Sequence, residues 1–212
     1  MAGYRDLRDR MVDEQIARRG VRDELVLKAM RAVPRECFVC ETEAEFAYDD
    51  APLPIGEGQT ISQPYIVAAM IEATQVKAGD RVLEVGAGSG YAAAVIGQIA
   101  EHVHAIERHA TLALAAKQRV EDLGYDNIEI IVGDGTRGLP EYAPFDVILV
   151  SAGGPSVPRM LQEQLAIGGR LVMPVGNEFS QILRKVARRS QSEYEETDLG
   201  GVRFVPLIGD HG

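Results

Sequence analysis

The spacing of apolar and polar residues predicts a regular core in the middle of the chain. From residue 81 onward, short apolar runs alternate with segments of helical periodicity, and a new strand begins roughly every 20–25 residues. Strands that alternate with helices at this interval are typical of a doubly wound, parallel sheet. The predicted strands are 81–86, 102–107, 128–132, 145–150 and 170–173, and the predicted helices are 90–100, 109–123 and 156–166.

The N-terminal part is predicted to be helical at both ends and irregular between them. Apolar residues recur at helical spacing in 4–19, 22–33 and 64–74. The intervening segment 47–62 contains two prolines and two glycines, which exclude a regular helix. Long ordered loops of this kind usually carry function, although a surface excursion is the structural alternative.

The C-terminal part alternates as a half-exposed strand does. We predict antiparallel strands at 181–189 and 203–208, joined by the polar stretch 190–200. The expected fold is therefore α/β: a doubly wound, Rossmann-like sheet, mostly parallel with antiparallel C-terminal strands, plus N-terminal helices. The length of 212 residues suits one domain. Its expected parts are N-terminal helices and a loop (1–75), a cofactor-binding core (76–175) and C-terminal strands (176–212).

Charge and hydropathy exclude several classes of function. The chain has 22 basic and 32 acidic residues and a net charge of −10, which argues against nucleic-acid binding. No apolar run approaches the ~20 residues of a membrane span, so we expect no membrane association. The N-terminus lacks the apolar core of a signal peptide, and a cytoplasmic location is expected.

The cysteines and histidines do not form a metal-binding pattern. Cys37 and Cys40 make one C-x-x-C pair, whereas a structural zinc site needs four ligands. The four histidines share no ligand spacing, so we expect no metal site. We interpret the two thiols as plain, partly buried side chains, with a redox pair as the weaker alternative.

Three glycines follow the first predicted strand of the core. Gly86, Gly88 and Gly90 lie at alternate positions before an alanine-rich helix. Glycine suits a tight turn here because it adopts positive φ and lets a ligand approach the backbone closely. The pattern predicts a nucleotide-type pocket, but Tyr91 stands where a dinucleotide fingerprint has its third glycine.

Acidic residues near this turn favour one class of ligand. Glu107 ends the next predicted strand and can accept hydrogen bonds from ribose hydroxyls. Asp134, with the backbone of Gly135, can meet an adenine amino group. Glu84 adds negative charge that repels a diphosphate and suits a cationic amine or sulfonium. Together they predict an S-adenosylmethionine pocket. The structural alternatives are a solvated strand end for Glu107, an Asp-Gly turn for Asp134, and a helix-capping or salt-bridging carboxylate for Glu84.

These residues, together with one loop, resemble a known family. Segments 84–91 and 133–135, with Glu107, resemble the core of class I methyltransferases. Segment 52–64 resembles the signature of protein-L-isoaspartate (D-aspartate) O-methyltransferases, and 203–208 is similar to the ending of that family. The resemblance covers nearly the whole chain. It implies methyl transfer from S-adenosylmethionine, leaving S-adenosylhomocysteine, to the free carboxylate of L-isoaspartyl and D-aspartyl residues in damaged peptides and proteins, which initiates their repair.

The resemblance also implies roles for individual residues. Ser62 would aim the carboxylate as the catalytic residue, and Thr60 would line the same pocket; the structural alternative for Ser62 is a helix cap. The implied cofactor-binding residues are Thr60, Ser62, Glu84, Gly86, Gly88, Gly90, Glu107, Asp134 and Gly135. The implied substrate-binding residues are Ile55, Gly56, Thr60, Ser62 and Val205, where exposed backbone would receive an extended peptide. The chain departs from similar enzymes at Cys37-Phe38-Val39-Cys40 and at Ile208. We assign no ligand role to the side chain of Ile208.

The expected reaction needs little from the protein besides orientation. The acceptor carboxylate has an ordinary pKa near ~4 and is ionised at neutral pH, so no general base is required. One alternative is a methyltransferase for another carboxylate or a small molecule. A nicotinamide oxidoreductase would need the missing third glycine, and a non-catalytic binding module would have lost cofactor residues that are present here. A monomer is expected.

Overall fold

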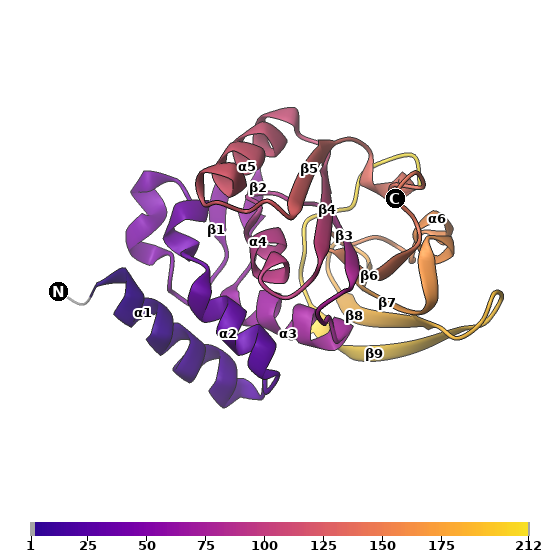
Figure 1. Ribbon diagram of the computed structural model, residues 1–212, viewed down its shortest axis with the longest axis horizontal. Coiled ribbons are helices and arrows are strands. Elements are labelled where there is room, and N and C mark those ends of the chain that lie inside the picture. Colours follow the sequence, from indigo (N-terminus) through magenta and orange to yellow (C-terminus); the bar gives the residue numbers. More distant parts are fainter. Residues whose placement is uncertain (1–2, 212) are drawn as a thin grey trace.

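The computed structural model describes residues 3–211 and confirms the predicted sheet (Figure 1). Seven strands of this region form one sheet in the spatial order β5-β4-β3-β6-β7-β8-β9. The strands from β5 to β7 are parallel, and β8 and β9 are antiparallel additions. The strands are β3 (Arg81–Val85), β4 (His102–Glu107), β5 (Ile128–Val132), β6 (Phe145–Val150), β7 (Leu165–Gly176), β8 (Gln181–Arg188) and β9 (Tyr194–Val202).

The order of the strands reverses at β3, which pairs with β4 on one side and with β6 on the other. In open parallel sheets, ligands bind beyond the carboxyl ends of the strands at such a reversal. The fold therefore directs attention to the loops that follow β3, β4 and β6.

Helices cover the two faces of the sheet unequally. The helices are α1 (Tyr4–Arg10), α2 (Glu24–Ala32), α3 (Pro64–Thr74), α4 (Tyr91–Gly97), α5 (Ala110–Asp122) and α6 (Arg159–Glu163). Further helical turns extend α1 to residue 19. Residues from α2 to α5 join one large apolar cluster with one face of the sheet, whereas in the cluster on the other face the strands pack against α6 and irregular segments. Helix α6 is shorter than the predicted 156–166 because Pro155 and Pro158 disfavour helix before it.

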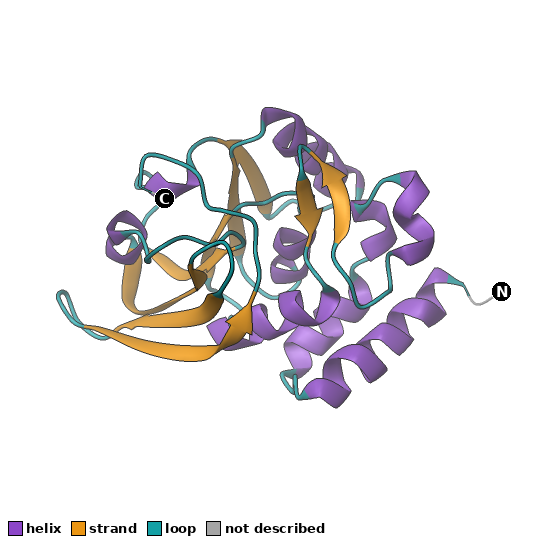
Figure 2. Ribbon diagram, turned by 180° about the vertical axis from the view of Figure 1, so that it is seen from behind, coloured by secondary structure: helices purple, strands orange, loops and turns teal. Residues whose placement is uncertain are grey.

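The irregular N-terminal segment contains a β-hairpin, visible as the separate pair of strands in Figure 2. Strand β1 (Leu53–Gly56) pairs with β2 (Gln59–Ile61) in antiparallel fashion. The two turn residues, Glu57 and Gly58, both have positive φ (51° and 68°), as a tight hairpin turn requires. The segment is therefore more regular than its proline and glycine content predicts.

The predicted C-terminal strand pair is partly wrong. β8 is where we expected it, but its partner β9 is formed by most of the polar stretch assigned to a connection. β9 is an edge strand with mostly exposed side chains, so backbone pairing with β8 forms it without an apolar pattern. The apolar segment 203–208 is not a regular strand; its Pro206 makes an isolated bridge to Gly153.

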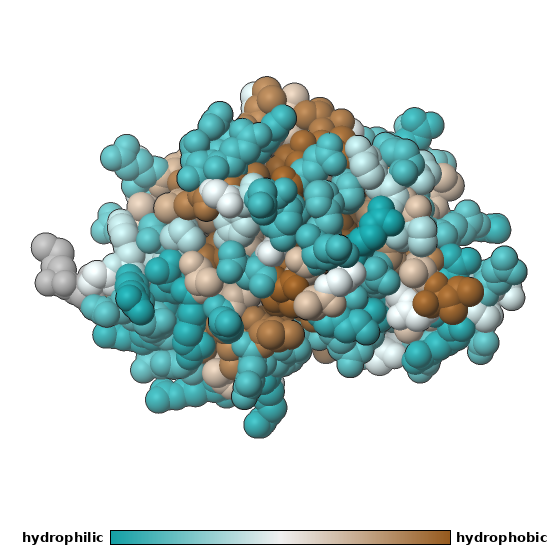
Figure 3. All heavy atoms as spheres, in the orientation of Figure 1, coloured by the Kyte–Doolittle hydropathy of each residue, from teal (hydrophilic) through white to brown (hydrophobic). Residues whose placement is uncertain are grey.

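The cysteine prediction is also wrong in part, because Cys37 and Cys40 are both free and exposed. Phe38 and Val39 between them occupy the buried positions, so the larger apolar side chains point inward at this turn. Hydrophilic residues cover most of the face drawn in Figure 3. Within residues 3–211, no helix is long and apolar enough to cross a membrane.

Candidate functional site

The carboxyl edge of the sheet holds a groove and two smaller cavities that adjoin the glycine turn. The groove has a volume of about 1260 Å³ and is lined by Thr60, Ser62 and residues of the C-terminal part. One cavity contains Glu107 and Gly135, and we call it the Glu107 cavity. The other, the Glu84 cavity, also contains Ser62. Thr60 lines all three spaces, so the β1–β2 hairpin lies at their junction.

The glycine turn after β3 has the backbone conformation that the sequence predicts. Gly86, Gly88 and Gly90 have φ values of 85°, 53° and 85°, in the region that favours glycine. A Cβ atom on Gly88 would lie 3.2 Å from Ile55 Cδ1. The turn therefore sits directly beneath the hairpin, and Gly86 and Gly88 line both smaller cavities.

Glu107 connects this turn to the end of β4. Its Oε2 accepts a hydrogen bond from Gly88 N at 2.9 Å, and its Oε1 accepts one from His109 N at 2.9 Å. Each carboxylate oxygen can accept further bonds, because a carboxylate offers about four acceptor positions. Glu107 is thus held in place while it can still bind hydroxyl groups of a ligand in its cavity.

Glu84 lies on β3, before the glycine turn, and is almost entirely buried. Its Oε1 accepts a weak hydrogen bond from Ser151 Oγ at 3.4 Å, and its Oε2 has no partner among the described residues. Burial raises the pKa of Glu84 to about 8, and the nearby charge of Glu107 adds to the effect. A cationic ligand would satisfy this unpaired carboxyl group and favour its ionised form.

Asp134 accepts hydrogen bonds from two parts of its own chain. Its Oδ1 accepts hydrogen bonds from Thr136 N and Thr136 Oγ1, and its Oδ2 accepts one from Asp210 N at 2.8 Å. Desolvation opposes ionisation of this carboxyl, but these bonds outweigh it and hold its pKa below the ordinary value. The side chain thus caps the turn after β5 and anchors the C-terminal segment, whereas Gly135 lines the Glu107 cavity.

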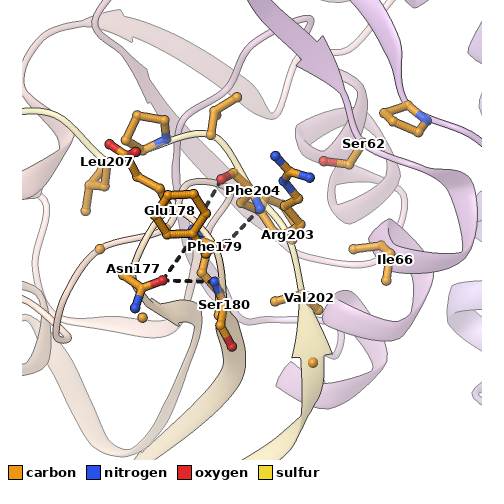
Figure 4. Close-up of a pocket in the computed structure, with 18 of the residues that line it drawn as sticks. Ser62, Ile66, Asn177, Glu178, Phe179, Ser180, Val202, Arg203, Phe204 and Leu207 are labelled. Carbon is orange, nitrogen blue, oxygen red and sulfur yellow. Dashed lines mark hydrogen bonds between the residues drawn. The ribbon is translucent and has the colours of Figure 1, made fainter.

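Ser62 borders both the groove and the Glu84 cavity. It is not the cap of α3, because that position belongs to Gln63, whose side chain makes no capping bond. The helix-cap explanation of Ser62 is therefore wrong. In Figure 4, Ser62 and Ile66 lie on one side of the groove, the turn from Asn177 to Ser180 lies on the other, and Arg203 and Phe204 lie between them.

The remaining predicted substrate residues divide into two groups. Val205 lines both the groove and the Glu107 cavity. Ile55 instead packs over the glycine turn, and a Cβ atom on Gly56 would lie 4.0 Å from Leu112 Cδ2 of α5. The structure therefore brings Thr60, Ser62 and Val205 together, and it leaves Ile55 and Gly56 outside the lining of the groove.

Sequence reasoning missed Arg35, which holds the hairpin segment at both ends. Its Nε donates to Ala47 O at 2.7 Å, and its Nη2 donates to Ser62 O at 2.8 Å. The side chain is fully buried, and its guanidinium lies 4.8 Å from the ring centre of Tyr91. Desolvation lowers the pKa of Arg35. The sequence could have indicated this role, because Arg35 lies between the apolar residues Val33 and Phe38, which are both buried.

Comparisons with known proteins agree with this geometry. The family model described as protein-L-isoaspartate(D-aspartate) O-methyltransferase matches residues 6–212. A relative from Pelobacter propionicus named protein-L-isoaspartate O-methyltransferase 2 is 55% identical over 97% of this chain and 92% of its own. One from Rhodopseudomonas palustris (strain HaA2), named protein-L-isoaspartate O-methyltransferase 1, is 59% identical over 97% of this chain and 84% of its own.

Solved structures show the same similarity. A structure named protein-L-isoaspartate O-methyltransferase matches with a TM-score of 0.88 and 30% identity, over 97% of this chain and 67% of that one. A putative protein-L-isoaspartate O-methyltransferase from Plasmodium falciparum, in complex with S-adenosyl-L-homocysteine, matches with a TM-score of 0.83 and 26% identity, over 95% and 98% of the two chains.

Proposed function

Because this chain belongs to the protein-L-isoaspartate(D-aspartate) O-methyltransferase family, we propose that Ser62 and Thr60 present the substrate carboxylate for methylation. The protein is an S-adenosylmethionine-dependent carboxyl O-methyltransferase. It acts on the free carboxylate of L-isoaspartyl and D-aspartyl residues in damaged peptides and proteins, and so initiates their repair. The observation that carries the residue assignment is the position of Thr60, which borders the groove and both smaller cavities.

The residues around the glycine turn fit the cofactor. S-adenosylmethionine supplies an electrophilic methyl group on a positively charged sulfur. The unpartnered Oε2 of Glu84 suits the cationic end of this molecule, and the Glu107 carboxylate suits its ribose hydroxyls. Gly86, Gly88 and Gly135 leave space beside these groups, and Gly90 completes the turn.

Asp134 has a modified role in this proposal. Its carboxylate already accepts three hydrogen bonds from its own chain. We therefore assign Asp134 to holding Gly135 in place, and it contributes to the adenine end through that backbone. A carboxylate of this kind can accept a further bond, so direct contact is the second option.

The chemical demand on the chain is positional. The acceptor carboxylate is ionised at neutral pH, so no residue has to remove a proton. The Ser62 hydroxyl can donate a hydrogen bond to one carboxylate oxygen and thereby fix the direction of the other. Correct alignment of two reacting groups can supply roughly 7–11 kcal/mol of the rate enhancement. Ser62 and Thr60 therefore need only orient the carboxylate in order to contribute to catalysis.

The groove suits an extended peptide. Its walls come from the β1–β2 side and from segment 203–207, and its volume of about 1260 Å³ exceeds that of one amino acid. Val205 belongs to this surface. Ile55 and Gly56 are not among the residues that line the groove, and their contact with the peptide stays a prediction. Methylation of another carboxylate or of a small acceptor is the alternative function.

A paired-peptide assay tests this function. Two synthetic peptides of the same sequence, one with L-isoaspartate and one with L-aspartate, are incubated with the protein and tritium-labelled S-adenosylmethionine. We expect label, released as methanol by mild base, from the isoaspartyl peptide alone. Equal labelling of both peptides, or of neither, would contradict the proposal.

Five further expectations belong to this proposal. The net charge of −10 supports a partner set without nucleic acid, and the free thiols of Cys37 and Cys40 are consistent with a cytoplasmic location. We also expect one domain over residues 1–212 and a monomer without membrane association, which size-exclusion chromatography with light scattering and vesicle co-sedimentation would check.

A further inference from the structure

The chain changes its hydrogen-bonding partner within the segment that lines the groove. β9 pairs with β8 as far as Val202, which is opposite Gln181. Farther along, Val205 O accepts from Gly153 N at 2.8 Å, and Leu207 N donates to Gly153 O at 2.7 Å. The segment thus passes from the antiparallel extension of the sheet to the end of β6. Phe204 lies between the two sets of backbone bonds.

The side-chain amide of Gln181 bridges this gap. Its Oε1 accepts a hydrogen bond from Phe204 N at 2.7 Å, and its Nε2 donates one to Phe204 O at 3.2 Å. Two bonds to the N–H and C=O of one residue copy the pairing that an opposing strand residue makes in an antiparallel ladder. Gln181 is 5% exposed, so water has little access to replace these bonds. A Cβ on Gly153 would lie 2.4 Å from the Gln181 Nε2, so glycine there makes room for the amide.

The residue that Gln181 holds is part of two walls. Phe204 lines the groove, where Figure 4 shows it between Ser62 and the turn at 177–180, and it also lines the Glu84 cavity together with Ser62. Arg203 lines the groove only. Val205, the next residue, has its own bond to Gly153. Loss of the Gln181 amide would therefore loosen Arg203 and Phe204 while Val205 stayed attached.

We propose that Gln181 is a positioning residue for the peptide: its amide holds Arg203 and Phe204 in the extended form against which the substrate binds. The proposal rests on the proposed function. It assigns to Gln181 a larger effect on peptide binding than on cofactor binding. Gln181 and Arg203 line the groove and neither smaller cavity, and the groups around the glycine turn make no hydrogen bond to Gln181.

The chain contains a matched control in Gln164. Its Oε1 accepts from Leu139 N at 2.8 Å, its Nε2 donates to Arg137 O at 2.8 Å, and it is 6% exposed. Gln164 and Gln181 therefore make the same two kinds of bond at similar burial, although the bonds of Gln164 go to two residues and those of Gln181 to one. The segment that Gln164 holds does not line the groove. Replacing Gln164 costs hydrogen bonds and stability without touching the peptide surface.

The experiment compares Gln181→Met with Gln164→Met in the full chain. Methionine is similar in length and keeps neither bond. We expect both variants to melt at a lower temperature than the wild-type protein. Only Gln181→Met should raise KM for the isoaspartyl peptide, by about tenfold, because two hydrogen bonds that order the surface are lost. The affinity for S-adenosylhomocysteine, measured by calorimetry, should change less than threefold in both.

Amide hydrogen exchange supplies a readout that does not depend on activity. The amide hydrogen of Phe204 should exchange faster in Gln181→Met than in the wild-type protein. Its exchange rate should be unchanged in Gln164→Met. Gln181→Glu serves as the second variant, should Gln181→Met fail to fold. It keeps an acceptor for Phe204 N but places a carboxylate oxygen against Phe204 O, so a rise in KM at least as large as that in Gln181→Met is expected.

Three outcomes would overturn the inference. They are an unchanged KM in the Gln181 variants, an equal rise in KM in Gln164→Met, and unchanged exchange at Phe204. A wild-type protein that methylated no isoaspartyl peptide would instead overturn the proposed function. Exchange at Phe204 would still report whether Gln181 holds the segment.

Discussion

The cofactor side and the peptide side of this site are built in different ways. On the cofactor side, Glu84, Gly88 and Glu107 come from the ends of adjacent parallel strands and are joined directly, as in the bond from Gly88 N to Glu107. On the peptide side, Ser62 and Phe204 come from segments that lie outside the parallel strands. A buried polar side chain holds each of these segments, Arg35 for Ser62 and Gln181 for Phe204.

The difference shows how a chain can keep a precise shape where it leaves the sheet. A backbone that leaves a ladder loses its hydrogen-bonding partners, and buried groups without partners cost free energy. Arg35 and Gln181 replace those partners from outside the ladder. The peptide side therefore depends on single side chains, whereas the cofactor side is supported by continuous strand pairing.

The largest expected effect concerns Ser62. In Ser62→Ala the carboxylate loses a hydrogen-bond donor, and we expect kcat for the isoaspartyl peptide to fall by about 100-fold, the order found when one donor to a reacting oxygen is removed. The dissociation constant of S-adenosylmethionine should stay within threefold. Steady-state kinetics and calorimetry would measure the two effects, with Ser192→Ala as the control. A collapse of cofactor affinity with normal turnover at saturation would contradict our assignment.

Arg35 is the next test of the comparison. Arg35→Met removes the donors to Ala47 O and Ser62 O, and each bond to a charged donor contributes about 1.5–3 kcal/mol. Removal of a buried charge offsets part of the loss, so we expect the free energy of unfolding in urea to fall by about 2–3 kcal/mol. KM for the peptide should rise as well. The exposed Arg18→Met should change neither, and a variant as stable as the wild-type protein would show that Arg35 does not hold the segment.

Glu107 tests the cofactor side. Glu107→Gln replaces one acceptor oxygen by an NH₂ group, which accepts no hydrogen bond. The two oxygens of Glu107 accept from Gly88 N and His109 N, and the variant loses one of these two bonds. We expect the dissociation constant of S-adenosylhomocysteine to rise about tenfold, with a smaller change in KM for the peptide. Glu129→Gln, an exposed substitution of the same kind on β5, is the control in calorimetry. A larger effect on the peptide than on the cofactor would remove the distinction between the two sides.

The smallest expected effect is a pH dependence from Glu84. Its pKa of about 8 means that the carboxyl is mostly protonated at pH 6 and must ionise to pair with a cation. Affinity for S-adenosylmethionine should therefore increase several-fold from pH 6.5 to 7.5, where an α-amino group stays largely protonated, and by less than tenfold per pH unit. Glu84→Gln should bind more weakly and with no such slope. Calorimetry that found equal slopes in both proteins would exclude this role.

Much of this protein was determined by patterns local in the sequence. The parallel strands, the glycine turn and Glu107 were predicted because a buried strand, a tight turn and a strand end each leave a short-range signal. The polar strand β9 left no such signal, since an edge strand needs backbone pairing rather than apolar side chains. The exposure of Cys37 and Cys40 was missed because their neighbours Phe38 and Val39 occupy the core.

Only the tertiary structure decided which distant groups meet. Asp134 binds the backbone of Asp210 as well as its own turn, and Ser62 is freed from capping because Gln63 takes that position. The contacts of Arg35 with Ser62 and of Gln181 with Phe204 join residues separated by 27 and 23 positions. These contacts form because packing of the whole sheet brings the two segments of each pair together. The periodicity of apolar residues along the sequence carries no information about which distant segments become neighbours.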